Sequence, residues 1–114
     1  MQIRKTYKEV NPELLYAEIR DFTLKQGVSL GDAKLETYGL PDDSANFVSR
    51  GTLTFKARGK TGQEKECLIA HVVGSVRTET KLMLDIDEEL FPKEKASALQ
   101  ADLDFIFSAY EVKG

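Results

Sequence analysis

The sequence predicts an α+β protein in which an antiparallel sheet of about five strands carries an N-terminal helix and a long C-terminal helix on one face. Three observations favour this class. Apolar and polar residues alternate through residues 47–58 and 76–87, which is the period of a half-buried strand. Glycine-containing turn segments separate the strands, and a helical apolar pattern lies on either side of the strand region. The 114 residues contain no linker or repeat, so we expect one domain over residues 1–114.

The first part of the chain predicts a helix between two edge strands. Residues 2–9 and 33–38 have the short, polar character of edge strands. Between them, the segment 11–13 (Asn-Pro-Glu) combines an N-cap residue, a proline at the first helical position and an acid in the first turn. The helix is therefore expected over residues 12–26, with Gly27 after its C-terminal end. Its apolar stripe is Leu15, Ile19 and Phe22, with Tyr16 beside it.

Two turns determine the predicted register of the three central strands, because the middle strand, 67–73, is apolar on both faces. Residues 59–63 suit a three-residue hairpin loop with a bulge at Gly62. Gly74 and Ser75 suit a two-residue type II′ turn. Counting back from either turn places the odd-numbered residues of the middle strand on the dry face of the sheet.

In this register His71, the only histidine, lies on the dry face opposite Thr78. Cys67 is expected opposite Phe55 on the same face. A slip of one residue would move every side chain to the other face, so the register decides what each residue can do. On the other face the register pairs opposite charges, Glu66 with Lys56 and Glu64 with Arg58.

The last part of the chain predicts a long second helix. It is expected to begin at Pro92 and to run to about Tyr110. At 1.5 Å per residue its length is about 28 Å, enough to cross the sheet and cover its dry face. Its apolar stripe is Leu99, Leu103, Ile106 and Tyr110, widened by Phe107.

The segment 11–22, Asn-Pro-Glu-Leu-Leu-Tyr-Ala-Glu-Ile-Arg-Asp-Phe, leads from a proline–acid helix start to an Asp-Phe pair. Together with the long terminal helix, it resembles the START-like helix-grip proteins, the superfamily of the polyketide cyclases and dehydratases. The resemblance implies a curved antiparallel sheet that grips the C-terminal helix around a cavity for apolar or amphipathic small molecules. The chain is shorter than that family and has five recognisable strands, so the resemblance implies a truncated cavity or none.

A small-molecule pocket is the first functional hypothesis. His71 would be a polar island on an apolar face, and ligand pockets combine mostly apolar walls with a few polar groups. The alternative is a buried neutral histidine that is hydrogen-bonded to Thr78 or to water. We therefore predict non-catalytic binding of a small apolar or amphipathic molecule between the sheet and the C-terminal helix. The predicted ligand contacts are His71, Thr78, Thr80, Ser49, Phe55, Leu103 and Phe107.

The outer face of the sheet supports a second hypothesis. In the predicted register, Leu68, Ala70 and Val72 form an apolar row on that face. Such a row is either covered by the stems of arginine and lysine side chains or used as a partner surface. It predicts a protein-interaction or assembly module, with a homodimer as one form.

Catalytic chemistry has weaker support. Cys67 and His71 would share a face, but four residues along a strand separate them by about 13 Å, too far for a nucleophile and its base. One histidine and one cysteine do not make a metal site. We expect no catalytic residue, metal or cofactor. A cyclase- or hydratase-like enzyme with His71 as acid or base is the third alternative.

Charge and composition argue against several other classes. The formal net charge is −3 and the lysines and arginines are scattered, so we expect no nucleic-acid partner. No apolar run approaches the roughly 20 residues that span a bilayer, and the first residues do not resemble a signal peptide. We expect a cytoplasmic protein without a membrane span.

Overall fold

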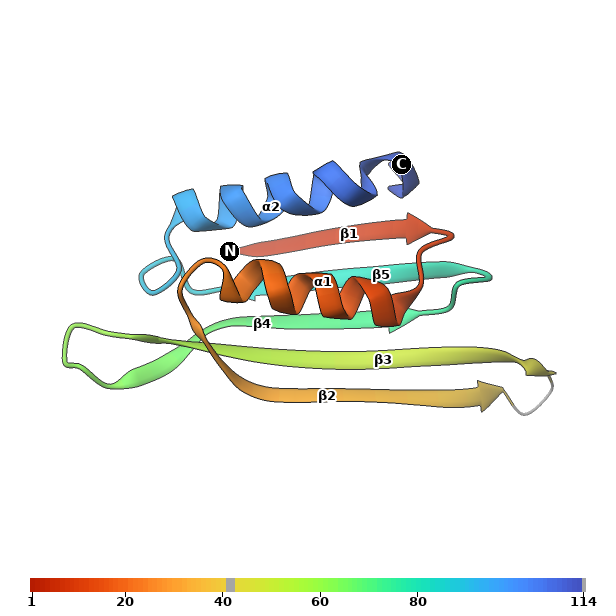
Figure 1. Cartoon of the computed structure of the whole chain (residues 1–114), viewed down its shortest axis with the longest axis horizontal. Coiled ribbons are helices and arrows are strands. Elements are labelled where there is room, and N and C mark those ends of the chain that lie inside the picture. Colours follow the sequence, from red (N-terminus) through yellow and green to blue (C-terminus); the bar gives the residue numbers. More distant parts are fainter. Residues whose placement is uncertain (41–42, 114) are drawn as a thin grey trace.

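The computed structural model describes residues 1–40 and 43–113, and it confirms the predicted α+β class (Figure 1). Five antiparallel strands form one sheet in the order β1-β5-β4-β3-β2. The first strand therefore lies beside the last one, at the edge opposite β2. The elements are β1 (Gln2–Lys8), α1 (Pro12–Leu24), β2 (Ser29–Leu40), β3 (Asp43–Arg58), β4 (Glu64–Gly74), β5 (Glu79–Ile86), α2 (Lys93–Phe107) and a 3₁₀ turn (Ser108–Tyr110).

The helix α1 begins where the sequence predicts. Its N-cap is Asn11, whose side-chain oxygen accepts the N–H of Glu13 at 2.8 Å. The helix ends at Leu24, two residues before its predicted end. Gly27 follows with φ of 88°, a left-handed conformation that favours glycine. The buried residues of α1 are Pro12, Leu15, Tyr16, Ile19 and Thr23.

The helix α2 is shorter than predicted. It ends at Phe107, and a 3₁₀ turn replaces the last predicted helical turn. Ile106 and Tyr110 are exposed at 41% and 46%, so their assignment to the buried stripe is wrong. Ile106 is turned about 100° around the helix from Phe107, and Tyr110 lies beyond the α-helix. The buried stripe is Ala96, Leu99, Leu103 and Phe107.

The turn between β3 and β4 has the predicted form. Gly62 is left-handed with φ of 81°, and the N–H of Gly59 donates to the carbonyl oxygen of Gln63 at 3.0 Å. The register is therefore correct at this end of the hairpin. The charge pairs next to the turn are confirmed, Lys56 with Glu66 and Arg58 with Glu64.

Beyond these pairs, Cys67 interrupts the register. Phe55 pairs with Leu68, so the predicted pairing of Phe55 with Cys67 is wrong. Cys67 is an extra residue on β4, which makes the strand bulge at this point. Because side chains alternate along a strand, one extra residue exchanges the two faces of β4 from Leu68 onward.

The turn between β4 and β5 is longer than predicted. The N–H of Ser75 donates to the carbonyl oxygen of Glu79 at 3.2 Å, and the N–H of Thr78 donates to that of Ser75 at 3.1 Å. The two-residue turn is therefore wrong, because three residues separate this pair rather than two. His71 consequently lies opposite Met83 and not opposite Thr78.

The bulge and the longer turn place β4 with its even-numbered residues in the core. Leu68, Ala70 and Val72 are each 1% exposed, so their assignment to an outer interface is wrong. His71 is exposed, so its predicted place on the dry face is wrong as well. Both helices cover the buried face of the sheet. Its other core residues include Tyr7, Leu53, Phe55, Leu82, Leu84 and Ile86.

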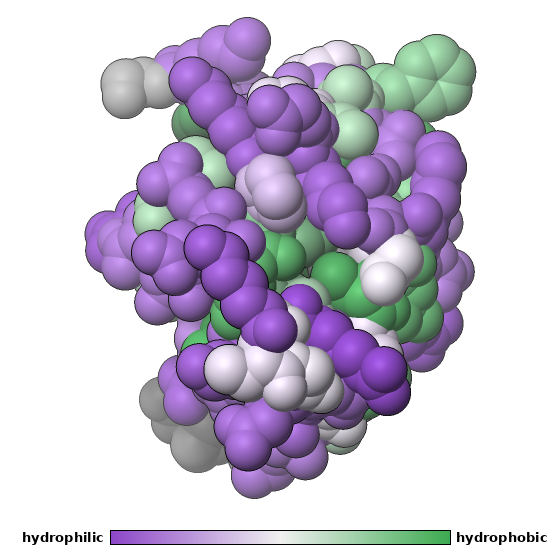
Figure 2. All heavy atoms as spheres, turned by 90° about the vertical axis from the view of Figure 1, so that its left-hand side faces the viewer, coloured by the Kyte–Doolittle hydropathy of each residue, from purple (hydrophilic) through white to green (hydrophobic). Residues whose placement is uncertain are grey.

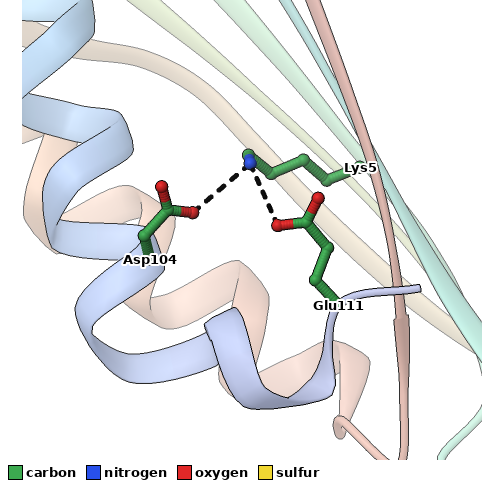
Figure 3. A network of polar contacts seen from close by, with 3 residues as sticks. All are labelled: Lys5, Asp104 and Glu111. Carbon is green, nitrogen blue, oxygen red and sulfur yellow. Dashed lines mark hydrogen bonds and ion pairs between the residues drawn. The ribbon is translucent and has the colours of Figure 1, made fainter. Parts of the chain in front are cut away.

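The C-terminal segment lies along β1. The N–H of Val112 donates to the carbonyl oxygen of Thr6 at 2.7 Å. Figure 3 shows the side chain of Lys5 reaching from β1 to Asp104 on α2 and to Glu111 in the C-terminal segment. The end of the chain is therefore attached to its beginning through both backbone and side-chain contacts.

The surface at the β3–β4 end of the molecule is largely hydrophilic. Figure 2 views this end, where most hydrophobic residues lie recessed between hydrophilic ones. Among the described residues, neither helix combines the length and the apolar character that a membrane crossing requires.

Candidate binding surface

The residues predicted to bind a ligand do not come together. His71 is exposed on the sheet face away from the helices, and Thr78 is exposed in the β4–β5 turn. Thr80 is buried, and its Oγ1 donates to a backbone carbonyl oxygen of the β1–α1 connection at 2.8 Å. The Oγ of Ser49 lies 3.0 Å from the Oγ1 of Thr37. The three others are core residues, Phe55, Leu103 and Phe107.

Packed side chains occupy the space between the sheet and α2. Leu99 and Leu103 are fully buried, and the ring centroids of Tyr7 and Phe107 are 5.7 Å apart. The five main hollows among the described residues are all lined by residues outside α2. The geometry here is that of a core and not of a pocket.

The sheet face turned away from the helices, here called the open face, is the better candidate for a site. Strand pairing aligns its outward side chains in two adjacent rows that cross all five strands. The first row is Arg4, Met83, His71, Thr52 and Lys34. The second row is Thr6, Lys81, Val73, Arg50 and Glu36.

The two rows carry an excess of positive charge. Arg4, Lys34, Arg50 and Lys81 are cations, and Glu36 is the one acid of these ten residues. The two helices on the other face contain six acids and three bases. The net charge of −3 is thus divided unevenly, with a positive band across the sheet and a negative helical layer.

Glu36 is held ionised at the β2 end of the rows. The hydroxyl of Tyr38 donates to its carboxylate, and the Nζ of Lys34 lies 3.2 Å from it. Hydrogen bonds from Tyr38 and then from Lys34 hold the pKa of Glu36 below its ordinary value. Glu36 is therefore an anionic acceptor on an edge strand.

The open face contains two adjoining hollows. One, of about 460 Å³, lies across β1, β5 and β4, and a second, of about 680 Å³, lies beside it at the β4–β5 turn. Both are lined by Val73 and Lys81. Val73 and Met83 are half-buried, so the first hollow is partly apolar, and Arg4 adds a cation to it.

Neither His71 nor Cys67 has the surroundings that nucleophilic catalysis requires. The direct cross-strand neighbours of His71 are Met83 and Thr52, and neither is a carboxylate that could orient and stabilise a catalytic imidazole. Burial raises the pKa of the Cys67 thiol to about 11, so this thiol stays protonated at neutral pH. The part of the chain that the structure describes has no group of three or more potential metal ligands.

Comparison with known proteins gives no match to a family model, a curated protein or a solved structure. The resemblance of residues 11–22 to the helix-grip proteins therefore stays a prediction.

The sequence prediction missed Arg4, Thr6 and Met83 as members of a candidate site. A signal was present in β1, where even-numbered positions are polar while Ile3 and Tyr7 share the other face. The sequence did not reveal that β1 pairs with β5, because this contact joins segments that lie far apart in the sequence. The polar position of Lys81 agrees with the predicted alternation of residues 76–87.

Proposed function

We propose that this chain is a protein-interaction module whose open face binds an acidic, partly apolar segment of a partner protein. The observation that carries the proposal is the alignment of Arg4, Lys81, Arg50 and Lys34 in two adjacent rows around Val73. Complementary charge steers the encounter of two proteins and suppresses wrong partners. The negative helical layer would help to orient such a partner toward the sheet.

The apolar residues between the cations favour a protein segment over a small anion. Ile69, Val73 and Met83 are half-buried on the open face, although no described element covers them. Protein interfaces combine apolar contacts with a charged rim. An acidic segment with apolar side chains could enter the two hollows and contact the surrounding cations together.

Nucleic acid is a less suitable partner. Proteins that bind single strands stack bases on aromatic side chains. Among the outward-facing residues in the described strand pairing, Tyr38 is the one aromatic residue.

A homodimer with the two open faces packed together is also disfavoured. Such a dimer would bring Arg4, Arg50 and Lys81 of both copies into one interface. Like charges in an interface cost free energy, so this face is better matched to an acidic surface than to itself.

A small-molecule ligand between the sheet and α2 is less well supported, because Leu99, Leu103 and Phe107 are buried in the space in which it would lie. An acid or base role for His71 has no carboxylate beside it to support it. The interaction module is the alternative that the arrangement of charges favours.

Fluorescence anisotropy with a short fluorescein-labelled peptide of alternating glutamate and valine tests the proposal. We expect the protein to bind this peptide with an affinity that falls as salt is added, because salt screens exposed charges. The double variant Arg4→Glu/Lys81→Glu should bind about tenfold more weakly, since two attractive contacts become repulsive.

The matched control is Arg20→Glu/Lys93→Glu, which changes the net charge equally but lies on the helices. It should bind the peptide as the wild-type protein does. Equal losses in the two variants would show that net charge drives binding and would contradict the proposal. Absence of peptide binding would overturn it, as would tighter binding of an oligothymidylate than of the peptide.

A further inference from the structure

The two edges of the sheet differ in how they are covered. At the β1 edge, the C-terminal segment donates a hydrogen bond to Thr6, and Tyr7 forms a bridge with Glu111. At the other edge, no described residue pairs with the outer side of β2. The free N–H and C=O groups of an edge strand can pair with a strand of another chain.

The regular part of β2 is short and alternates in character. Register shifts between Leu30 and Ala33, and between Gly39 and Leu40, limit the regular pairing with β3 to residues 33–39. Within it, Lys34, Glu36 and Tyr38 point to the open face. Ala33, Leu35 and Thr37 point to the helix side.

We propose that β2 pairs antiparallel with β2 of a second copy of this chain, with Leu35 on the two-fold axis. In this arrangement Lys34 lies opposite Glu36 of the second copy, and Glu36 lies opposite Lys34 of the second copy. On the helix side, Leu35 meets its own counterpart. The edge is thus self-complementary in both charge and hydrophobicity, as a two-fold interface requires.

Charge selects this register over its neighbours. A two-fold axis perpendicular to the sheet keeps the helices of both copies on one side. Such an axis must lie midway between the two copies of one β2 residue, so that this residue faces its own counterpart. An axis at Lys34 would place Lys34 opposite itself and Asp32 opposite Glu36. An axis at Glu36 would place Glu36 opposite itself. Like charges in direct opposition are destabilising, so the axis at Leu35 is favoured over these two neighbouring axes.

The side chains that this pairing uses are accessible. The exposed side-chain fractions of Lys34 and Glu36 are 74% and 39%, and Leu35 is 40% exposed. The present contact between Lys34 and Glu36 lies within one strand, so the dimer would give each carboxylate a second lysine. Cross-strand pairs of opposite charge stabilise a sheet, and the backbone hydrogen bonds between the two strands add to this contribution.

Pairing at this edge would also join the open faces of the two copies. Because the axis is perpendicular to the sheet, both faces point the same way and form one continuous surface. The inference rests on the β2 edge alone, so it is independent of what binds the open face.

Variants that reverse or exchange the charges of Lys34 and Glu36 test the pairing. Light scattering over a concentration series measures dimerisation. The wild-type protein should dimerise as its concentration rises. Lys34→Glu places acids opposite each other, and Glu36→Lys places lysines opposite each other, so each single variant should dimerise about tenfold more weakly. The double variant Lys34→Glu/Glu36→Lys should recover dimerisation, and an equimolar mixture of the two single variants should form a heterodimer.

Disulfide cross-linking tests the position of the axis. Leu35→Cys should cross-link under oxidising conditions, because the two copies of this residue are direct neighbours. Ala33→Cys is the matched control on the same face, about 13 Å from its own copy and too far to bond. The native Cys67 is 1% exposed and does not compete.

Three results would overturn the proposal. The wild-type protein could stay monomeric at about 1 mM, where even weak pairing would be visible. The single charge variants could dimerise as the wild type does, which would place the contact elsewhere. Ala33→Cys could cross-link as readily as Leu35→Cys, which would exclude the axis at Leu35.

Discussion

Lys5 on β1 binds Glu111 near the C-terminus, with 3.2 Å between Nζ and Oε1 (Figure 3). The same Nζ lies 3.3 Å from Oδ1 of Asp104 on α2. The side chains of Lys5 and Glu111 are only 12% and 16% exposed, so water screens this pair weakly. Lys5 therefore attaches both α2 and the C-terminal segment to the first strand.

The first prediction concerns this attachment. Glu111→Gln should lower the free energy of unfolding by about 1 kcal/mol, because Lys5 loses its better-shielded anionic partner but keeps Asp104. Urea unfolding measures the loss. Hydrogen exchange of the Val112 amide, which donates to Thr6, should become faster at the same time.

The control for this prediction is Asp21→Asn. Asp21 pairs with Arg20 at 3.2 Å, but both side chains are well exposed, so the change in unfolding free energy should stay within about 0.5 kcal/mol. If Glu111→Gln costs no more than Asp21→Asn, Lys5 does not hold the C-terminal segment.

The second prediction concerns Gly51, on which Tyr16 of α1 packs. A Cβ at position 51 would lie 2.8 Å from Cε2 of the Tyr16 ring and closer still to Cδ2. Gly51→Ala should therefore lower the free energy of unfolding by about 2 kcal/mol through overpacking. In a Tyr16→Ala background the same substitution should cost much less, because the ring is gone. Urea unfolding of the four proteins gives this coupling.

Gly39→Ala is the matched glycine control in β2. A Cβ there would lie 3.8 Å from Cε1 of Phe47, which is an ordinary contact, so stability should be unchanged or slightly higher. A loss at Gly51 that equals the change at Gly39, or that is the same with and without the Tyr16 ring, would contradict the role given to Tyr16.

Local chemistry explains why most elements could be predicted from the sequence. Asn11 and Pro12 begin α1, and Gly62 forms the left-handed position of the β3–β4 turn. Each of these signals needs only neighbours in the chain. The end of α2 was harder to predict. Phe107 and Tyr110 are both aromatic, but Phe107 is buried and Tyr110 is exposed because the 3₁₀ turn lies between them.

The register of β4 depended on contacts that no local signal reports. Cys67 and Leu68 are both apolar and both 1% exposed, so alternation could not show which residue is the extra one. Only the pairing of β4 with β3 identifies it, since Lys56 lies opposite Glu66 and Phe55 lies opposite Leu68. One misplaced residue was enough to move His71 from the open face to the core in the predicted register.

The candidate surface was less predictable than the fold for the same reason. Its rows combine side chains from five strands, and Arg4 lies opposite Met83 only because β1 pairs with β5. Charges that look scattered in the sequence, such as Arg4, Arg50 and Lys81, are brought onto two adjacent rows of one face by this topology. The residues that form one face of a sheet can be predicted only when the register of every strand pair is known.

The third prediction concerns the buried thiol of Cys67. Burial raises its pKa to about 11 in the folded protein, whereas an exposed cysteine in the unfolded chain has a pKa of about 8.5. Below the unfolded value both states keep the proton, so this thiol contributes no pH dependence there. Between about pH 8.5 and pH 11 the unfolded chain loses the proton while the folded protein keeps it, so stability falls as the pH rises.

Urea unfolding between pH 8 and pH 10.5, compared with Cys67→Ala, isolates this contribution. The alanine variant lacks the thiol and leaves a small cavity, and the free-energy cost of this cavity does not change with pH. The wild-type free energy of unfolding should fall more steeply, by up to about 1.4 kcal/mol per pH unit more than the variant. Groups such as lysine titrate alike in both proteins and cancel. Parallel pH profiles would mean that the thiol ionises as readily in the folded protein as in the unfolded chain, which its burial at the β4 bulge opposes.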